Sequence, residues 1–163
     1  MLRNGISVRN QEWIERQLNY VWKTYFFDVP EHNPVYIEFG RRARTRLGSI
    51  SLDPNQPQTS RIRITGWFRY EEVPVSVVHS VIIHEMCHYA HGFHSSAEQR
   101  HKHPHAGGVI RKEFADRGLE DLYDYQQQWL KTQWPRFIKK YYKPTSPNKK
   151  KPIGHRIKLS LFG

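Results

Sequence analysis

The segment "VPVSVVHSVIIHEMCHYAHG", residues 73–92, is the most informative part of the sequence about the fold. Its β-branched residues would suit a strand, but the two ends of the stretch favour a helix. Pro74 and the two acidic residues before it make a favourable first turn, and Gly92 is a suitable residue to end a helix. Because the segment is apolar nearly all round, we expect a buried helix at the centre of the fold.

Two histidines and a glutamate in the second half of this helix predict a metal centre. His84 and His88 are four residues apart, so on a helix they lie on the same face. Both imidazoles can then reach one zinc ion at about 2.0–2.1 Å. Glu85 would lie beside that ion, where it can take a proton from a water molecule whose pKa zinc lowers to about 7. A surface helix with scattered histidines is the simpler alternative, but unpaired buried histidines are costly, and the zinc site is favoured.

A catalytic zinc site needs a third protein ligand and an open fourth position. His105 is the preferred candidate, because the glycines that follow it in "HPHAGG" permit close approach of the backbone. His94 has the spacing of the longer motif His-Glu-x-x-His-x-x-Gly-x-x-His, but His91 occupies the glycine position of that motif. An acidic ligand from the next helix would be Glu113. His91 is expected beside the site or on the surface rather than on the metal. The remaining candidates on the loop are His101 and His103.

The chain before the central helix predicts one helix and a small sheet. A helix is expected over 7–27, with Ser7 as its N-cap. Alternating apolar and polar residues predict three strands, at 34–40, 46–53 and 61–68.

The chain after the central helix is expected to be helical and then basic. A loop at 95–108 leads to a short helix at 109–118 and a longer one that Pro135 should kink or end. The net charge of +11 is uneven: residues 1–124 hold 16 Lys/Arg and 15 Asp/Glu, whereas residues 125–163 hold 10 Lys/Arg and no acid. We therefore divide the chain into a near-neutral domain, 1–124, and a basic helix with a flexible tail, 125–163.

The basic residues predict contact with a nucleic acid. The tail combines cations with aromatic residues, which can neutralise phosphates and stack on unpaired bases. The segment "RRARTR", residues 41–46, adds four cations near the expected metal centre. No pattern for reading base sequence is visible, so non-specific DNA contact is expected; a solvated tail, or contact with an acidic protein, is the alternative. The candidate contact residues are Arg41, Arg42, Arg44, Arg46, Lys139, Lys140, Lys149, Lys150 and Lys151.

Length and composition exclude several classes of protein. At 163 residues the chain suits one domain with an extension, and its 37% hydrophobic content argues against general disorder. No apolar run is long enough to cross a membrane, and the first residues lack the apolar core of a signal peptide. The single cysteine, Cys87, excludes an internal disulfide and a four-cysteine zinc ribbon, and is expected to be a packed core thiol. A cytoplasmic protein, associated with the nucleoid if it contacts DNA, is expected.

Three segments resemble the SprT-like (Spartan-type) metallopeptidase domain, over roughly half of the chain. "RRARTRLGSISLD" (41–53) is similar to the basic strand pair of that family, and "VVHSVIIHEMCHYAHG" (77–92) to its active-site helix. "PHAGGVIRKEFADRGL" (104–119) is similar to the segment that supplies the third zinc histidine and then a helix. Ala106 and Val109 differ from the glycine and the aromatic residue of the family pattern, and the zinc ribbon of bacterial members cannot form with one cysteine.

The resemblance implies both a fold and a function. It implies one catalytic Zn²⁺ bound by His84, His88 and His105, with Glu85 as catalytic base, in a peptidase that acts on proteins bound or crosslinked to DNA. The expected architecture is α+β and zincin-like, with an N-terminal helix and a three-stranded, mainly antiparallel sheet packed on the active-site helix, followed by a helical C-terminal part. Two other functions stay open: a non-catalytic, zinc-containing DNA-binding accessory protein, and a regulatory zincin that cleaves one specific partner such as a repressor.

Overall fold

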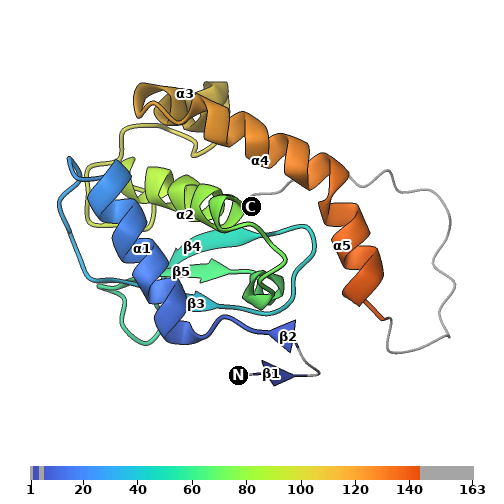
Figure 1. Ribbon diagram of the computed structural model, residues 1–163. Helices are drawn as coiled ribbons and strands as arrows, with labels where there is room; N and C mark the ends of the chain where they lie inside the picture. The colour runs from blue at the N-terminus through green and yellow to red at the C-terminus, as the bar shows by residue number, and fades with distance from the viewer. Residues whose placement is uncertain (1, 4–5, 144–163) are drawn as a thin grey trace, which may run out of the picture.

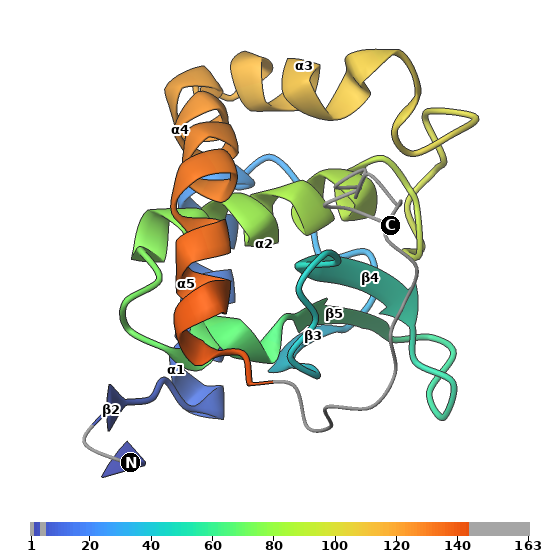
Figure 2. The ribbon, with the colours of Figure 1, turned by 90° about the vertical axis from the view of Figure 1, so that its right-hand side faces the viewer.

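The computed structural model describes residues 2–3 and 6–143, with side chains from residue 8 onward, and has an α+β fold. Helix α2 (Val75–Ala90) lies against a three-stranded sheet, and α1 (Gln11–Tyr25) lies against both the sheet and α2 (Figure 1). Helices α3 (Val109–Asp116) and α4 (Glu120–Thr132) pack on α2 from the other side, and α5 (Trp134–Tyr141) follows (Figure 2). The prediction of a central helix within residues 73–92 is therefore confirmed.

The sheet is mixed rather than mainly antiparallel. Its order is β3 (Val35–Phe39), β5 (Ser60–Ile64), β4 (Gly48–Leu52), with β3 parallel and β4 antiparallel to β5. The prediction of a mainly antiparallel sheet is wrong because the chain crosses from β3 to the opposite edge before β5 enters between the two strands. The central isoleucines of the three strands pair in register and are buried: Ile37, Ile62 and Ile50.

The first helix begins later than the sequence predicts. Asn10, not Ser7, is its N-cap: the Asn10 side chain accepts a hydrogen bond of 2.8 Å from the backbone N–H three residues on. Ser7 lies instead in a short strand, β2 (Ile6–Ser7), which pairs with β1 (Leu2–Arg3). Asparagine and serine cap helices about equally well, so the residue types alone did not distinguish the two positions.

The chain turns sharply after β5. The predicted third strand continues to residue 68, but β5 ends at Ile64 and a short 3₁₀ helix, η1 (Gly66–Arg69), follows. A Cβ on Gly66 would lie 2.6 Å from the carbonyl oxygen of Gly40, so the turn can approach the end of β3 only at a glycine. Trp67 and Phe68 of η1 are buried, which explains the strand-like apolar pattern of this segment.

Helix α2 is buried over almost its whole length. From Val77 to Ala90 every residue except His79 is buried. Cys87 is among them, so its thiol packs in the core as predicted. Beyond the helix, Gly92 has a φ of +82°, and a Cβ there would lie 2.4 Å from a backbone oxygen of the following loop. Glycine at this position is therefore required by both the backbone conformation and the contact.

The C-terminal helices pack on the rest of the fold. α4 ends at Thr132, and Pro135 lies in the first turn of α5, where its missing N–H costs no hydrogen bond. Trp134 and Phe137 are buried and contact the aromatic residues of η1 edge-to-face. The predicted boundary between residues 124 and 125 falls inside α4. Across the residues that the structure describes, no helix has the length and apolar content needed to cross a bilayer.

Candidate metal centre

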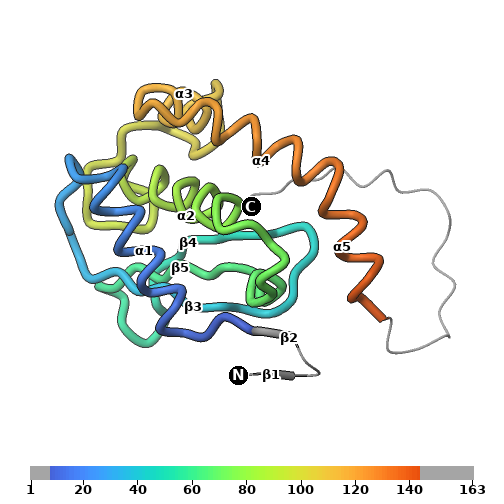
Figure 3. Tube along the Cα trace, viewed as in Figure 1, coloured from blue at the N-terminus to red at the C-terminus, as the bar shows by residue number. Residues whose placement is uncertain are grey.

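Three histidine side chains from two separate segments meet beside α2. His84 and His88 come from α2, and His105 comes from the loop between α2 and α3. Figure 3 shows the path of that loop. One ligand atom of each lies within 4.8 Å of the others, and Nε2 of His84 is 3.3 Å from Nε2 of His105. Two nitrogens that bind one tetrahedral zinc ion at 2.0–2.1 Å are about 3.4 Å apart. The arrangement therefore fits one transition-metal ion of the kind that imidazole binds, such as zinc, copper or nickel.

The surroundings of these histidines keep them neutral. Burial, with the neighbouring imidazoles as a further cause, lowers the pKa of His84 well below its ordinary value and that of His88 to about 3. His105 is more exposed than the other two, and the partial loss of water around its ring lowers its pKa as well. Neutral imidazole is the form that binds a metal. Nδ1 of His88 is buried without a hydrogen-bond partner among the described residues, which argues against a purely structural role for this ring.

The loop between α2 and α3 returns His105 to α2. Midway along the loop, the N–H of Arg100 donates to the carbonyl oxygen of His91 at 2.9 Å, which holds the loop against the end of the helix. Near its end, Gly107 and Gly108 have φ values of +67° and +69°. Because this left-handed conformation favours glycine, the two residues allow the chain to turn from His105 directly into α3.

The carboxyl group of Glu85 is buried where α2 meets the edge strand β4. The residue is 2% exposed, and a Cβ on Gly48 would lie 2.6 Å from Oε1 of Glu85, so β4 can approach α2 here only at a glycine. Burial raises the pKa of Glu85 to about 8, and the positive charge of Arg46 opposes that rise. A carboxyl group whose pKa lies near neutrality can both accept and donate a proton.

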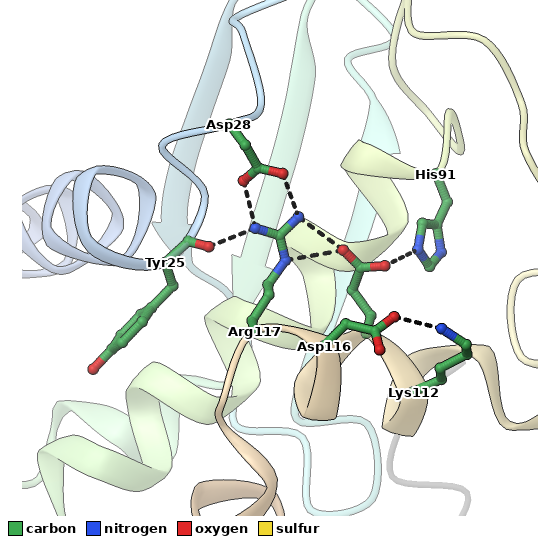
Figure 4. Close-up of polar contacts among 7 residues, drawn as sticks. Tyr25, Asp28, His91, Lys112, Asp116 and Arg117 are labelled. Carbon is green, nitrogen blue, oxygen red and sulfur yellow. Dashed lines mark hydrogen bonds and ion pairs between the residues drawn. The ribbon is translucent and has the colours of Figure 1, made fainter.

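A chain of charged groups connects α2, α3 and the segment after α1 (Figure 4). Nε2 of His91 lies 2.9 Å from Oε2 of Glu113, and Oε1 of Glu113 accepts a hydrogen bond of 2.9 Å from Nε of Arg117. Arg117 also donates to the carboxylate of Asp28 at 2.6 Å and to the backbone oxygen of Tyr25 at 2.5 Å. These contacts hold α3, and with it the end of the loop that carries His105, in place beside α2.

Glu113 is thus engaged in a structural network rather than in the histidine group. The hydrogen bond from His91, followed by the contact with Arg117, lowers the pKa of Glu113 to about 2 and keeps it ionised. No motif in the sequence distinguishes Arg117 from the other arginines. Its only local signal is the four-residue spacing from Glu113 on the predicted helix, a spacing that many surface ion pairs share.

The other histidines of the loop lie outside the group of three. His94 has a φ of +54°, and its carbonyl oxygen accepts a hydrogen bond of 2.5 Å from Oγ of Ser60. The ring of His101 packs edge-on against that of His91, with 4.6 Å between centroids, and His103 is exposed. Within the described residues, His105 is the loop histidine that joins His84 and His88.

The arginine loop, residues 41–46, lies against the aromatic residues of η1 and α5. The guanidinium of Arg42 lies over Trp67 at 4.8 Å, and that of Arg44 over Tyr142 at 4.2 Å. The indole N–H of Trp134 donates to the carbonyl oxygen of Arg44 at 2.9 Å. The loop is therefore fixed in position, while its arginine side chains remain exposed.

These contacts bring some of the predicted nucleic-acid-binding residues close to one another. Lys139 and Lys140 lie on α5, which ends next to the arginine loop because Arg44 stacks on the residue just beyond that helix. Lys139 is exposed, and Lys140 forms an ion pair of 2.9 Å with Glu72. The other predicted residues lie outside the described part of the chain: Lys149, Lys150 and Lys151.

No protein-family model, curated protein or solved structure matches the chain. The likeness to SprT-like domains therefore rests on the sequence motifs, and the function of the site has to be inferred from its own residues.

Proposed function

We propose that the protein is a zinc-dependent peptidase with a zincin-like arrangement, in which His84, His88 and His105 bind one Zn²⁺ and Glu85 is the general base. The observation that carries the proposal is the meeting of three neutral imidazoles beside a helix that also holds a buried carboxyl group. A set of three protein ligands leaves a fourth position for water or substrate, as is typical of catalytic rather than structural zinc sites.

Each side chain then has a defined task. Zn²⁺, when bound, supplies a Lewis acid that lowers the pKa of a water molecule and polarises a carbonyl group. Burial raises the pKa of Glu85, and a nearby cation opposes that rise, so Glu85 can take a proton near neutral pH and pass it to the leaving amine. The close contact with Gly48 fixes the Glu85 side chain against β4 and limits its motion.

We further propose that the substrates are proteins associated with DNA, and that the protein acts in the cytoplasm. Support comes from the exposed cations of the arginine loop and of α5, which lie together in the fold, and from the strongly basic sequence after residue 124. Such a surface neutralises phosphates without reading bases. The buried free thiol of Cys87 suits a reducing compartment.

The test compares the zinc content and peptidase activity of wild type, Glu85→Gln and Glu98→Gln. Glu98 is an exposed carboxylate on the loop and serves as the matched control. Glu85→Gln should keep zinc and lose cleavage of a mixture of DNA-binding proteins by at least about 100-fold, whereas Glu98→Gln should behave as wild type. Retained cleavage in Glu85→Gln contradicts the proposed mechanism. A zinc-loaded wild type that cleaves nothing indicates the accessory protein instead, and one that cuts a single protein indicates the regulatory zincin.

A further inference from the structure

A cavity of about 600 Å³ lies under the arginine loop. Its wall includes Glu38, Arg63 and Ser49, which pair in register across the three strands. Side chains alternate between the two faces of a sheet, so these three lie on the face opposite the buried isoleucines and α2. Arg41 and Arg46 of the arginine loop close the other side. The cavity is therefore bounded by the sheet and by a loop whose backbone is fixed.

The charges around this cavity do not cancel. Nε of Arg63 lies 2.7 Å from Oε1 of Glu38, so these two side chains neutralise one another. Arg41 and Arg46 form no ion pair within the described part of the chain. Both guanidinium groups are exposed and border the cavity, and guanidinium groups bind carboxylates and phosphates with paired hydrogen bonds. The cavity is thus suited to an anionic group.

The cavity and the proposed catalytic carboxyl group lie on opposite sides of β4. Gly48 lines the cavity, and the same residue is the point where β4 contacts Glu85. The charge of Arg46, on the cavity wall, also acts on Glu85. Because β4 is an edge strand, a peptide lying along it would present successive side chains to opposite faces of the sheet. One side chain would then lie on the side of Glu85 and the next on the side of the cavity.

We propose that this cavity binds a carboxylate of the polypeptide substrate, so that cleavage favours sites with an acidic group close to the bond that is cut. The proposal rests on the proposed peptidase function and adds a substrate class to it. One feature favours a peptide carboxylate over a nucleic-acid phosphate: the cavity lies directly across β4 from Glu85, so a peptide held along that edge strand for cleavage would place one of its side chains at the cavity.

The first test measures binding without cleavage. Zinc-loaded, full-length Glu85→Gln protein is titrated with three six-residue probes: amidated hexaglutamate, hexaglutamine with a free C-terminus, and amidated hexaglutamine. Tighter binding of the first identifies a side-chain carboxylate, and tighter binding of the second a terminal carboxylate. Adding Arg41→Gln and Arg46→Gln should weaken the preferred probe at least about 10-fold, because each lost charged contact is worth more than a neutral hydrogen bond. Adding Arg16→Gln, an exposed arginine of α1, should change nothing.

The proposal is overturned if all three probes bind equally well. It is also overturned if Arg16→Gln weakens binding of the preferred probe as much as Arg41→Gln and Arg46→Gln do. A ten-nucleotide oligothymidylate that binds in an Arg41- and Arg46-dependent manner while the peptides do not overturns it too, because the cavity is then a phosphate site.

The second test uses cleavage by wild-type protein. A library of cellular peptides is digested, and the residues around each cut are read by mass spectrometry. We expect enrichment of acidic residues at one fixed distance from the cut, and loss of that enrichment in the Arg41→Gln, Arg46→Gln double variant. Cleavage without any acidic enrichment contradicts the inference and leaves the peptidase function standing. Carboxylate binding in the first test with no cleavage in the second supports the anion site and rejects the peptidase.

Discussion

Replacing Glu113 by alanine should lower the free energy of unfolding by about 2 kcal/mol. Glu113 accepts hydrogen bonds from Nε of Arg117 at 2.9 Å and lies 2.8 Å from its Nη2 and 2.9 Å from Nε2 of His91. The Arg117 side chain is 10% exposed, so removing its partner leaves a largely buried cation. Because Arg117 keeps its contact with Asp28, the loss should be smaller than the 3–5 kcal/mol typical of a buried charge that loses its only partner.

The lowered pKa of Glu113 gives the size of this loss of stability in a second way and predicts how the loss depends on pH. Lowering this pKa from 4.5 to about 2 corresponds to about 3 kcal/mol, which solvent screening of a partly exposed pair reduces toward the same 2 kcal/mol. A carboxyl group whose pKa is depressed in the folded state stabilises the fold above its unfolded pKa and loses that effect as the pH falls. The difference in stability between wild type and Glu113→Ala should therefore be full at neutral pH and shrink between about pH 4.5 and pH 2.

Thermal unfolding followed by circular dichroism provides the measurement, with Asp116→Ala as the matched control. Asp116 lies on the same helix and forms an exposed ion pair with Lys112, as Figure 4 shows, so its loss should cost less than about 0.5 kcal/mol. At pH 7 we expect Tm to fall by about 4–8 °C in Glu113→Ala and to be nearly unchanged in Asp116→Ala. Equal effects of the two substitutions would refute the argument that the Glu113 network holds α3 in place.

Three further substitutions test the packing of the site and the basic surface. Gly48→Ala places a Cβ 2.6 Å from Oε1 of Glu85, so it should lower the free energy of unfolding by about 2 kcal/mol and remove most of the peptidase activity. Gly40→Ala, whose Cβ would have no contact closer than 3.7 Å, should leave stability to urea nearly unchanged, and an equal loss of stability in the two variants would contradict the close contact. Trp134→Phe removes the hydrogen bond to the arginine loop and should lower the free energy of unfolding by about 1 kcal/mol. An unchanged urea midpoint would contradict this prediction. Lys139→Ala should reduce the slope of log oligonucleotide affinity against log salt concentration by about one phosphate contact. A slope identical to that of wild type would show that Lys139 on α5 does not contact the nucleic acid.

The sequence predicts the parts of this fold that depend on local spacing. The apolar run around α2 indicates a buried helix, and the spacing of His84 and His88 places both on one face whatever the rest of the chain does. Alternation locates the three strands to within a few residues, although η1 has the same apolar pattern as the end of a strand. Strand order is not local, and the insertion of β5 between β3 and β4 leaves no trace in the alternation of any single strand.

The site combines local and long-range features in the same way. His105 reaches α2 only because of the path of the loop and the docking of α3, so spacing alone left His94 and Glu113 open beside it. The partners of Glu113 lie on different elements, and no periodicity connects them. The cavity under the arginine loop is equally non-local, since its wall is formed by three strands and the loop together.

The zinc content of His105→Ala, compared with that of His94→Ala, shows whether His84, His88 and His105 bind the metal. Both substitutions remove one imidazole from the same loop, and the structure places only His105 in the group with His84 and His88. After equilibration with one equivalent of Zn²⁺ and desalting, wild type and His94→Ala should each retain close to one zinc ion per chain, and His105→Ala should retain far less. A His105→Ala protein that keeps its zinc while His94→Ala loses it would contradict the metal centre proposed for this fold.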